Sequence, residues 1–222
     1  MSHKSIEIRY NRAMDRSDHM QATSKPSASE RIFTTAQAKC LGVPRNALAK
    51  ACAAGRLLRV MHGVYRMAGV PSAETDEFEA SWKLTAPSLF THERVQPSAW
   101  DGIAAGGATA ASIHGVGDFY LSLYILIAPQ RARSRFPGVT FAARELLCDD
   151  VIFKDGLPVT RIERMILDLV LLGEDPSLVR DALADARKAG LDEDRLRYLI
   201  GACGSARAAE RVRMALFGRE VS

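Results

Sequence analysis

Apolar and polar residues alternate along residues 56–67, RLLRVMHGVYRM, on both sides of a His62-Gly63 pair. An alternation with period two is typical of a β-strand, and a glycine-containing pair between two such runs is a turn signal. The stretch therefore predicts a β-hairpin with a two-residue turn at its tip. Counting outward from the turn pairs Met61 with Val64, Val60 with Tyr65, Arg59 with Arg66 and Leu58 with Met67.

This register gives the predicted hairpin an apolar inner face and a basic outer face. The inner residues are expected to be Leu58, Val60, Tyr65 and Met67. Arg59 and Arg66 then stand opposite each other outside, with His62 at the tip. Like charges at that separation destabilise a sheet by up to about 1 kcal/mol. A phosphate group between them would turn the repulsion into attraction, so the pattern favours a nucleic-acid-binding wing. The alternative is two solvated arginines that splay apart.

A helical pattern comes before the hairpin. Thr34 and Gln37 form the T-x-x-Q pattern of a capping box at the start of a helix over residues 35–41. Gly42 permits the backbone of a sharp turn, and Pro44 suits the first position of a second helix. Two helices joined by a tight glycine turn predict a helix-turn-helix, so the whole segment predicts a winged helix-turn-helix.

The second of these helices has a polar face. At 100° per residue, an arc of about 140° holds a set of cationic, amide and small side chains, namely Arg45, Asn46, Ala49, Lys50 and Ala53. In a DNA major groove, arginine and lysine can bond guanine, and asparagine can pair with adenine. The face is therefore predicted to contact DNA, and the alternative is an ordinary solvated surface.

The distribution of charge supports the prediction of DNA binding. Residues 31–73 contain seven basic residues and no acidic one, whereas residues 74–222 contain 18 basic and 22 acidic residues. Such a segment is typical of an anion-binding module joined to a module of another kind. The candidate DNA-binding residues are Thr34, Thr35, Arg45, Asn46, Ala49, Lys50, Arg56, Arg59, His62 and Arg66.

The chain as a whole predicts an α+β protein with two domains. The expected divisions are a poorly ordered tail at 1–29, the winged helix-turn-helix at 30–69, a linker at 70–76 and a larger α+β domain at 77–222 that ends in a helical bundle. The linker is expected because it combines glycine, proline and serine with the first acidic residues.

The larger domain is expected to begin with two helices and to continue with strands. The helices are predicted near 77–84 and 104–113, and the strands in LSLYILIAP, PGVTFAA and DVIFKDGLPV. Thr160 and Glu163 predict a capping box before a long helix. Three amphipathic helices are then predicted near 176–189, 192–202 and 205–217.

Few residues of the larger domain point to chemistry. Arg131, Arg133 and Arg135 form a candidate loop for an anion or an acidic partner, with a solvated turn as the alternative. His114 ends an apolar helix, where a hydrogen-bonded cap is favoured over a catalytic role. The sequence contains no motif of a nucleotide-binding loop, a serine hydrolase or a zinc protease, so we predict a protein that is not an enzyme and uses no cofactor.

The remaining signals concern metal and compartment. Four scattered cysteines without nearby histidines at ligand spacing argue against a metal site and against a disulfide framework. No apolar run approaches the ~20 residues of a membrane span, and the first residues lack the apolar stretch of a signal peptide. We therefore expect a cytoplasmic protein with no membrane partner, and, given the predicted DNA binding, association with a bacterial nucleoid.

These motifs resemble the AbiEi family of bacterial antitoxins. The segment FTTAQAKCLGVPRNALAKACAAGRLLRVMHGVYRMAG is similar to the winged helix-turn-helix of that family. GGATAASIHGVGD, YILIAPQRARSRFPGVTF and VIFKDGLPVTRIERMILDLV resemble its C-terminal domain in the same order. The resemblance departs from the family before the F-T-T motif, where members usually have a full helix. Residues 4–20 or the second domain are expected to brace the core instead.

The resemblance implies a type IV antitoxin. Such proteins repress their own operon by binding inverted repeats in double-stranded DNA. They also counteract a neighbouring nucleotidyltransferase toxin, AbiEii, often without a stable complex. Two alternatives stay open: a winged-helix regulator whose second domain senses a ligand without any toxin, and a nuclease or modifying enzyme that finds its substrate through the winged helix.

Overall fold

The computed structural model describes residues 30–96, 98, 100–131 and 138–218, and the chain divides into two compact units, Met1–Arg94 and Val95–Ser222. Both contain helices and strands, so the predicted α+β class is confirmed. The first unit has the element order β1 (Ile32–Thr34), α2 (Thr35–Cys40), α3 (Arg45–Ala53), β2 (Leu57–Met61), β3 (Val64–Met67), α4 (Asp76–Thr85) and α5 (Thr91–Arg94). Its three strands form an antiparallel sheet in the order β1-β3-β2.

The helix-turn-helix forms as its local signals predict. The Thr34 side chain accepts a hydrogen bond from the Gln37 amide at 3.0 Å, and the Gln37 side chain accepts one from the Thr34 amide at 2.8 Å. This completes the predicted capping box. The turn between α2 and α3 passes through Gly42, whose φ of 80° lies in the left-handed region that glycine tolerates. Pro44 caps α3 from just outside, one position earlier than predicted.

The hairpin has a different register from the one predicted. Met61 pairs with Val64 across the His62-Gly63 turn, but a β-bulge between Arg59 and Met61 shifts the remaining pairs by one residue. Arg59 therefore lies opposite Tyr65, and Arg66 lies opposite Leu58. A one-residue shift moves a side chain to the other face of a sheet. The predicted Arg59–Arg66 pair is thus wrong, because the two arginines lie on opposite faces.

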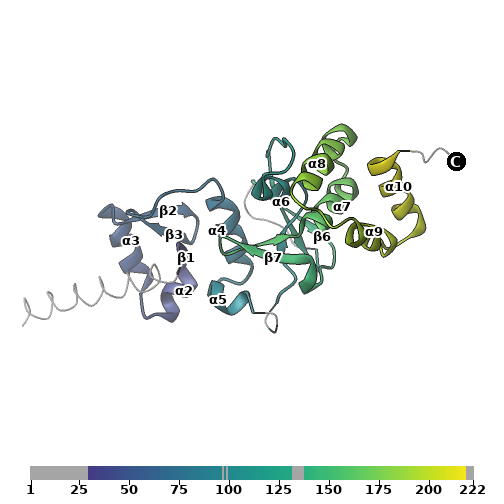
Figure 1. The fold of residues 1–222 in the computed structure, drawn as a ribbon. Coiled ribbons are helices and arrows are strands. Elements are labelled where there is room, and N and C mark those ends of the chain that lie inside the picture. Colours follow the sequence, from purple (N-terminus) through teal and green to yellow (C-terminus); the bar gives the residue numbers. More distant parts are fainter. Residues whose placement is uncertain (1–29, 97, 99, 132–137, 219–222) are drawn as a thin grey trace, which may run out of the picture. The chain divides into compact units, whose positions relative to one another are not determined.

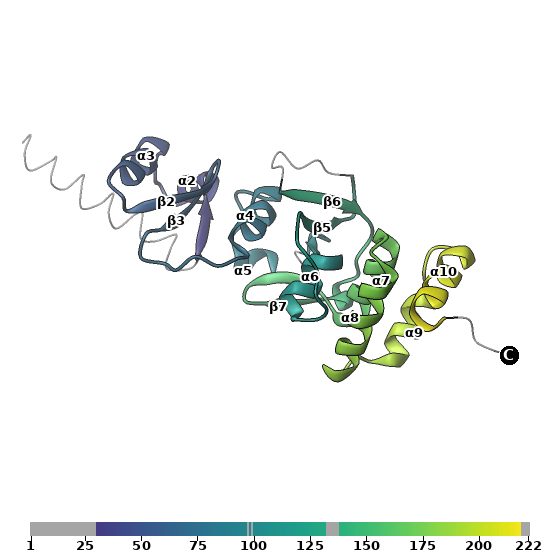
Figure 2. The ribbon, with the colours of Figure 1, turned by 90° about the horizontal axis from the view of Figure 1, so that it is seen from above.

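Both faces of this sheet are covered by helices (Figures 1 and 2). On one face, α2 and α3 pack on the sheet through a buried cluster of Phe33, Ala38, Val43, Leu48, Ala51, Leu57 and Tyr65. On the other face, α4 packs on β1 and β2 through a second cluster around Ile32, Val64 and Ala80. Adjacent strand residues alternate between the two clusters, as the period of a strand requires. Leu57 is buried and Leu58 is 43% exposed, the reverse of the predicted pattern, because of the bulge.

The boundary between the units lies after Arg94 rather than at the predicted linker 70–76. Asp76 ends that stretch and is buried, and its carboxylate accepts hydrogen bonds from Arg66 at 2.8 Å and from the Ala73 amide at 3.1 Å. The helix predicted near 77–84 forms as α4, within the first unit. This helix braces the sheet from within the first unit, because it packs on β1 and β2. Residues 4–20, which were expected to brace the core, lie outside the described residues.

The second unit is built on a five-stranded mixed sheet in the order β6-β5-β4-β8-β7. Its strands are β4 (Ala104–Ala105), β5 (Tyr124–Ala128), β6 (Val139–Ala143), β7 (Val151–Lys154) and β8 (Leu157–Thr160), with a short turn η2 (Cys148–Asp150) before β7. Helix α6 (Gly107–His114) packs against β5, β8 and α7 (Ile162–Leu172). The chain ends in α8 (Pro176–Lys188), α9 (Glu193–Gly201) and α10 (Ala206–Phe217), which pack with α7 as the predicted bundle.

Two sequence predictions for this unit have different outcomes. The Thr160–Glu163 capping box is wrong, because α7 begins at Ile162 without a side-chain cap. Glu163 instead accepts a hydrogen bond from the Asp192 amide at 3.0 Å. The hydrogen bond expected of His114 is present, since its Nε2 lies 2.8 Å from the Thr160 carbonyl oxygen. It joins α6 to β8, whereas the C-cap of α6 is Gly115. Burial lowers the pKa of His114, which favours the neutral imidazole.

A buried carboxylate lies where α7 meets the rest of this unit. Asp168 is fully buried, and its two oxygens accept hydrogen bonds from Nε of Arg164 at 3.2 Å. Arg164 also contacts Asp150 at 3.1 Å, and Asp150 is bound by Arg195 of α9 at 2.9 Å. Burial raises the pKa of Asp168 to about 6, against the opposing effect of Arg164.

This raised pKa predicts a defined pH dependence of stability. Between about pH 3.8 and pH 6 the folded state holds a proton on Asp168 that the unfolded state lacks, so the unfolding free energy falls as pH rises through that window. The full change is about 3 kcal/mol, from about 1.4 kcal/mol per pKa unit. Urea unfolding at pH 4 and pH 7 is expected to show this loss in the wild type but not in Asp168→Asn. Unfolding free energies that change equally with pH in the wild type and in Asp168→Asn would contradict the raised pKa of Asp168.

Candidate nucleic-acid interface

The exposed face of α3 contains the side chains that the helical periodicity predicts. Arg45, Asn46, Ala49 and Lys50 are all exposed. Leu48 and Ala51 of the same helix are 1% and 2% exposed and face the sheet. Ala53 is exposed as well, so the helix has an outer face of five residues, two of them long cations.

Five of the seven basic residues of segment 31–73 are exposed. They are Lys39, Arg45, Lys50, Arg56 and Arg59. None of these five forms an ion pair with another residue that the structure describes. The other two, Arg31 and Arg66, bind carboxylates of α4. The excess of positive charge is therefore presented to solvent by α2, α3 and the hairpin.

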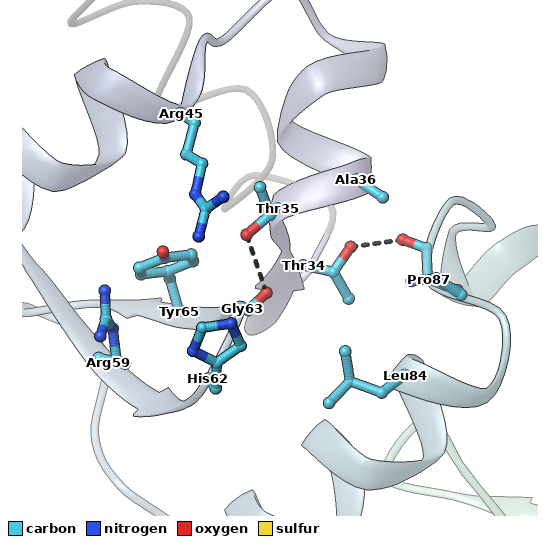
Figure 3. A pocket seen from close by; sticks show the side chains of 10 residues that line it. All are labelled: Thr34, Thr35, Ala36, Arg45, Arg59, His62, Gly63, Tyr65, Leu84 and Pro87. Carbon is cyan, nitrogen blue, oxygen red and sulfur yellow. Dashed lines mark hydrogen bonds between the residues drawn. The ribbon is translucent and has the colours of Figure 1, made fainter. Parts of the chain in front are cut away.

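Two of these five side chains, Arg45 and Arg59, line one pocket of about 280 Å³ (Figure 3). Its cationic and polar lining comes from α2, α3, β2 and the hairpin tip: Thr35, Arg45, Arg59 and His62. The Tyr65 ring lies between Arg45 and Arg59 (Figure 3), and the α4 side is lined by Leu84 and Pro87. The residues that line this pocket include no acidic side chain. The pocket thus offers two guanidinium groups and an imidazole to an anion.

Tyr65 orders the wall of this pocket. The Arg59 guanidinium carbon lies 5.8 Å from the centre of the Tyr65 ring, within the range of a cation–π contact. Tyr65 itself is 4% exposed and packs with Phe33 at a ring separation of 6.0 Å. The pairing of Arg59 with Tyr65 follows from the β-bulge, which is why the sequence did not predict Tyr65 as part of the site.

Thr35 connects the first helix to the hairpin tip. Its backbone amide donates to the Gly63 carbonyl at 2.8 Å, and its hydroxyl donates to the same oxygen at 3.2 Å. Gly63 has a φ of 80°, so the turn needs glycine at this position. The predicted site residue Thr35 therefore holds the tip, next to His62, against α2.

Two predicted DNA-binding residues are not available at the surface. Thr34 is 1% exposed, and its hydroxyl donates to the Pro87 carbonyl while it caps α2. Arg66 is 9% exposed and binds Asp76, because the bulge turns it toward α4. Arg66 therefore lies on the α4 face and away from the pocket, which corrects its predicted place beside Arg59. Thr34 borders the pocket, but its hydroxyl is already bonded to Pro87 and to the Gln37 amide.

The loop between α4 and α5 holds the capping box of α2 in place. Gln37 is fully buried, and its Nε2 donates to the Leu89 carbonyl at 2.7 Å. Together with the Thr34 bond to Pro87, this ties both capping residues to the same loop. The sequence did not predict these contacts, because they join positions about 50 residues apart.

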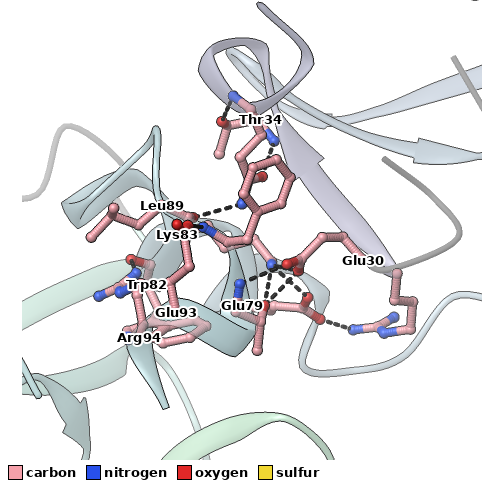
Figure 4. A network of polar contacts seen from close by, with 12 residues as sticks. Glu30, Thr34, Glu79, Trp82, Lys83, Leu89, Glu93 and Arg94 are labelled. Atoms are coloured by element: carbon pink, nitrogen blue, oxygen red, sulfur yellow. Dashed lines mark hydrogen bonds and ion pairs between the residues drawn. The ribbon is translucent and has the colours of Figure 1, made fainter. Parts of the chain in front are cut away.

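A buried ion network joins α4 to the two residues that precede β1 (Figure 4). Lys83 is 1% exposed and binds the carboxylate of Glu30, the Thr91 hydroxyl at 2.7 Å and Glu79 at 3.7 Å. Glu79 also binds Arg31. Burial raises the pKa of Glu79, partly opposed by Lys83 and Arg31. The network fixes α4 and α5 relative to the sheet that carries the pocket.

The second unit adds little to the candidate site. Arg131 is exposed, whereas Arg133 and Arg135 lie outside the described residues. Across the described ranges, no group of three or more His, Cys, Asp or Glu side chains is arranged to hold a metal ion. In the same ranges, no helix has both the length and the apolar character needed to cross a membrane.

Two comparisons with known proteins found a match, one in fold over most of the chain and one in sequence over residues 27–68. A crystal structure of the RV2827C protein from Mycobacterium tuberculosis is similar to this chain with a TM-score of 0.56 at 14% sequence identity. The match covers 89% of this chain and 75% of that one, and it concerns the fold. A search of curated proteins found no match. The family model described as "Transcriptional regulator, AbiEi antitoxin" matches residues 27–68, so the resemblance predicted from the F-T-T segment and the hairpin is confirmed for this part of the chain.

Proposed function

We propose that the chain is a DNA-binding transcriptional regulator and antitoxin that represses its own operon through inverted repeats. The observation that carries the proposal is the exposed cationic surface of α3 and the hairpin. Its arginines and lysine have no carboxylate partner among the described residues, and no acidic side chain lines its pocket. The match of residues 27–68 to AbiEi antitoxin regulators supports the same assignment. In this proposal the protein acts in the bacterial cytoplasm on nucleoid DNA and is not an enzyme.

The proposed contacts divide between bases and backbone. Asn46 and Lys50 lie on the exposed face of α3, where they suit base edges in the major groove. Arg56 and Arg59 lie in the hairpin region, where cations suit phosphates and position the protein on the duplex. Arg45 is at the start of α3, is exposed as well, and is assigned to the base edges together with Asn46 and Lys50.

The proposed toxin partner is a nucleotidyltransferase of the AbiEii type, counteracted without a stable complex. The second unit is assigned to this role, and the resemblance of its strand and α7 motifs to the family supports the assignment. An alternative is that the second unit senses a small ligand and no toxin is involved. A ligand-dependent rise in melting temperature, without a neighbouring toxin gene, would favour the alternative.

The proposed DNA binding is tested by fluorescence anisotropy with the duplex immediately upstream of the gene and with random duplex as competitor. We expect preference for the upstream duplex. We also expect that log affinity falls against log salt with a slope of about −4 to −5, from about five phosphate contacts. Equal affinity for both duplexes would contradict the proposed repressor, and affinity independent of salt would contradict the role of the cationic surface.

The division between base and backbone contacts gives a further prediction. Asn46→Ala is expected to relax specificity at one base position, at a cost of about 1–3 kcal/mol for the preferred base. Arg59→Ala is expected to weaken binding to all sequences by a similar factor. A binding selection over randomised operator sequences, run for both variants, measures the difference. The same loss of specificity in both variants would contradict the division.

A further inference from the structure

The pocket lined by Arg45, Arg59 and His62 has a composition suited to one phosphate group. A guanidinium group binds phosphate through two parallel N–H donors. Two guanidinium groups therefore suit a phosphate, which has more oxygens to accept these donors than a carboxylate has. A volume of about 280 Å³ lies just below the range for small-molecule sites, which is about 300–1,000 Å³. An open pocket of this size suits a group presented by a larger polymer.

Contacts within the first unit hold one arginine of the pocket and the hairpin tip in place before any ligand arrives. Arg59 lies over the Tyr65 ring, and His62 sits at a hairpin tip that Thr35 ties to α2 with two hydrogen bonds. Ordering side chains in advance lowers the entropic cost of binding. Arg45 enters from a different element, the first turn of α3. Three elements therefore bring two guanidinium groups and an imidazole to one pocket, and neither arginine has an ion-pair partner among the described residues.

We propose that this pocket binds a single phosphate of the DNA backbone, with Arg45 and Arg59 sharing that phosphate and His62 beside them. This inference rests on the proposed DNA-binding function and deepens it. It moves Arg45 from the base-reading set of α3 to the backbone contacts. It also makes the phosphate the fixed point from which Asn46, the next residue of α3, and Lys50, on the following turn, are placed over the bases.

The test uses the salt dependence of DNA binding by the full chain. Neutralising one phosphate changes the slope of log affinity against log salt by about 0.9. Because Arg45 and Arg59 act on one phosphate, the double variant Arg45→Gln/Arg59→Gln is expected to lose about 0.9 in slope, less than the sum of two independent contacts. The matched pair Arg56→Gln/Arg59→Gln has only one member in the pocket, so its single effects are expected to add. Additive effects in the pocket pair would overturn the shared phosphate.

A second measurement locates the phosphate. Duplexes of the upstream DNA with one neutral methylphosphonate at a time are expected to show one position where wild-type affinity falls about tenfold. Arg45→Gln and Arg59→Gln are each expected to show a smaller fall in affinity at that same position, because one arginine of the pair remains, while Arg56→Gln shows the full fall. Sensitivity lost at two different positions would overturn the inference while leaving the proposed repressor intact.

Free phosphate is the other source of the same chemistry. Inorganic phosphate is titrated into the DNA-free protein while the His62 ring resonances are followed by NMR. Saturation with phosphate, together with DNA affinity unchanged in both arginine variants, would overturn the assignment to the DNA backbone in favour of a free anion. Failure of the wild type to prefer its upstream duplex contradicts the proposed function instead, and the slope comparison on random duplex still decides the pocket.

Discussion

Replacing Lys83 by methionine is expected to lower the unfolding free energy of the first unit by about 3–5 kcal/mol. Removing one partner of a buried ion pair leaves the other charge uncompensated, and measured losses of this kind fall in that range. Lys83 is 1% exposed and its ammonium group contacts Glu30, Glu79 and the Thr91 hydroxyl. The methionine side chain keeps most of the volume, so the loss reports on the charge. Urea unfolding followed by circular dichroism measures it.

Two control variants separate this effect from general damage. Lys50→Met changes an exposed lysine of the same unit and is expected to alter stability by less than about 0.5 kcal/mol. Adding Glu30→Gln to Lys83→Met removes one of the stranded charges, so the double variant is expected to be more stable than the sum of the single losses implies. A Lys83→Met protein as stable as the wild type would contradict the buried network.

The features that the sequence could predict are those set by neighbouring residues. The capping box at Thr34 and Gln37 depends on two side chains three positions apart, and the turn after α2 depends on Gly42. The exposed face of α3 follows from helical periodicity alone. Such local signals were enough to predict the helix-turn-helix, the hairpin tip and the terminal helices of the second unit.

The features that the sequence could not predict depend on contacts between distant positions. The bulge near Val60 leaves Val60 and Met61 both packed on the α4 side, and no local pattern shows this. Alternation without a bulge would put Arg59 and Arg66 on one face. Helix α4 carries Asp76, Glu79 and Lys83, which give it the composition of a surface helix, yet all three are buried in ion pairs. The sequence therefore could not show that this helix belongs to the first unit.

The two arginines that the sequence paired across the hairpin are expected to behave in opposite ways. Arg66→Met is expected to lower the unfolding free energy by about 2–3 kcal/mol, because Asp76 then loses a buried cation and keeps Arg31 and the Ala73 amide. Arg59→Met changes an exposed side chain, so stability is expected to stay within about 0.5 kcal/mol of the wild type while DNA affinity falls about tenfold. Urea unfolding and anisotropy titrations on the same preparations measure both quantities.

The comparison is made at a temperature where each variant remains folded, as judged by circular dichroism. Under that condition Arg66→Met is expected to bind the upstream duplex within about threefold of the wild type, since its side chain is 9% exposed on the α4 face. An Arg66→Met protein with wild-type stability and weakened DNA binding would contradict the bulged register. It would support the register without a bulge, in which both arginines lie on one outer face. The observed pairing of Arg59 with Tyr65 and of Arg66 with Leu58 leads to the opposite result, because the bulge gives one arginine to the pocket and the other to the α4 contacts.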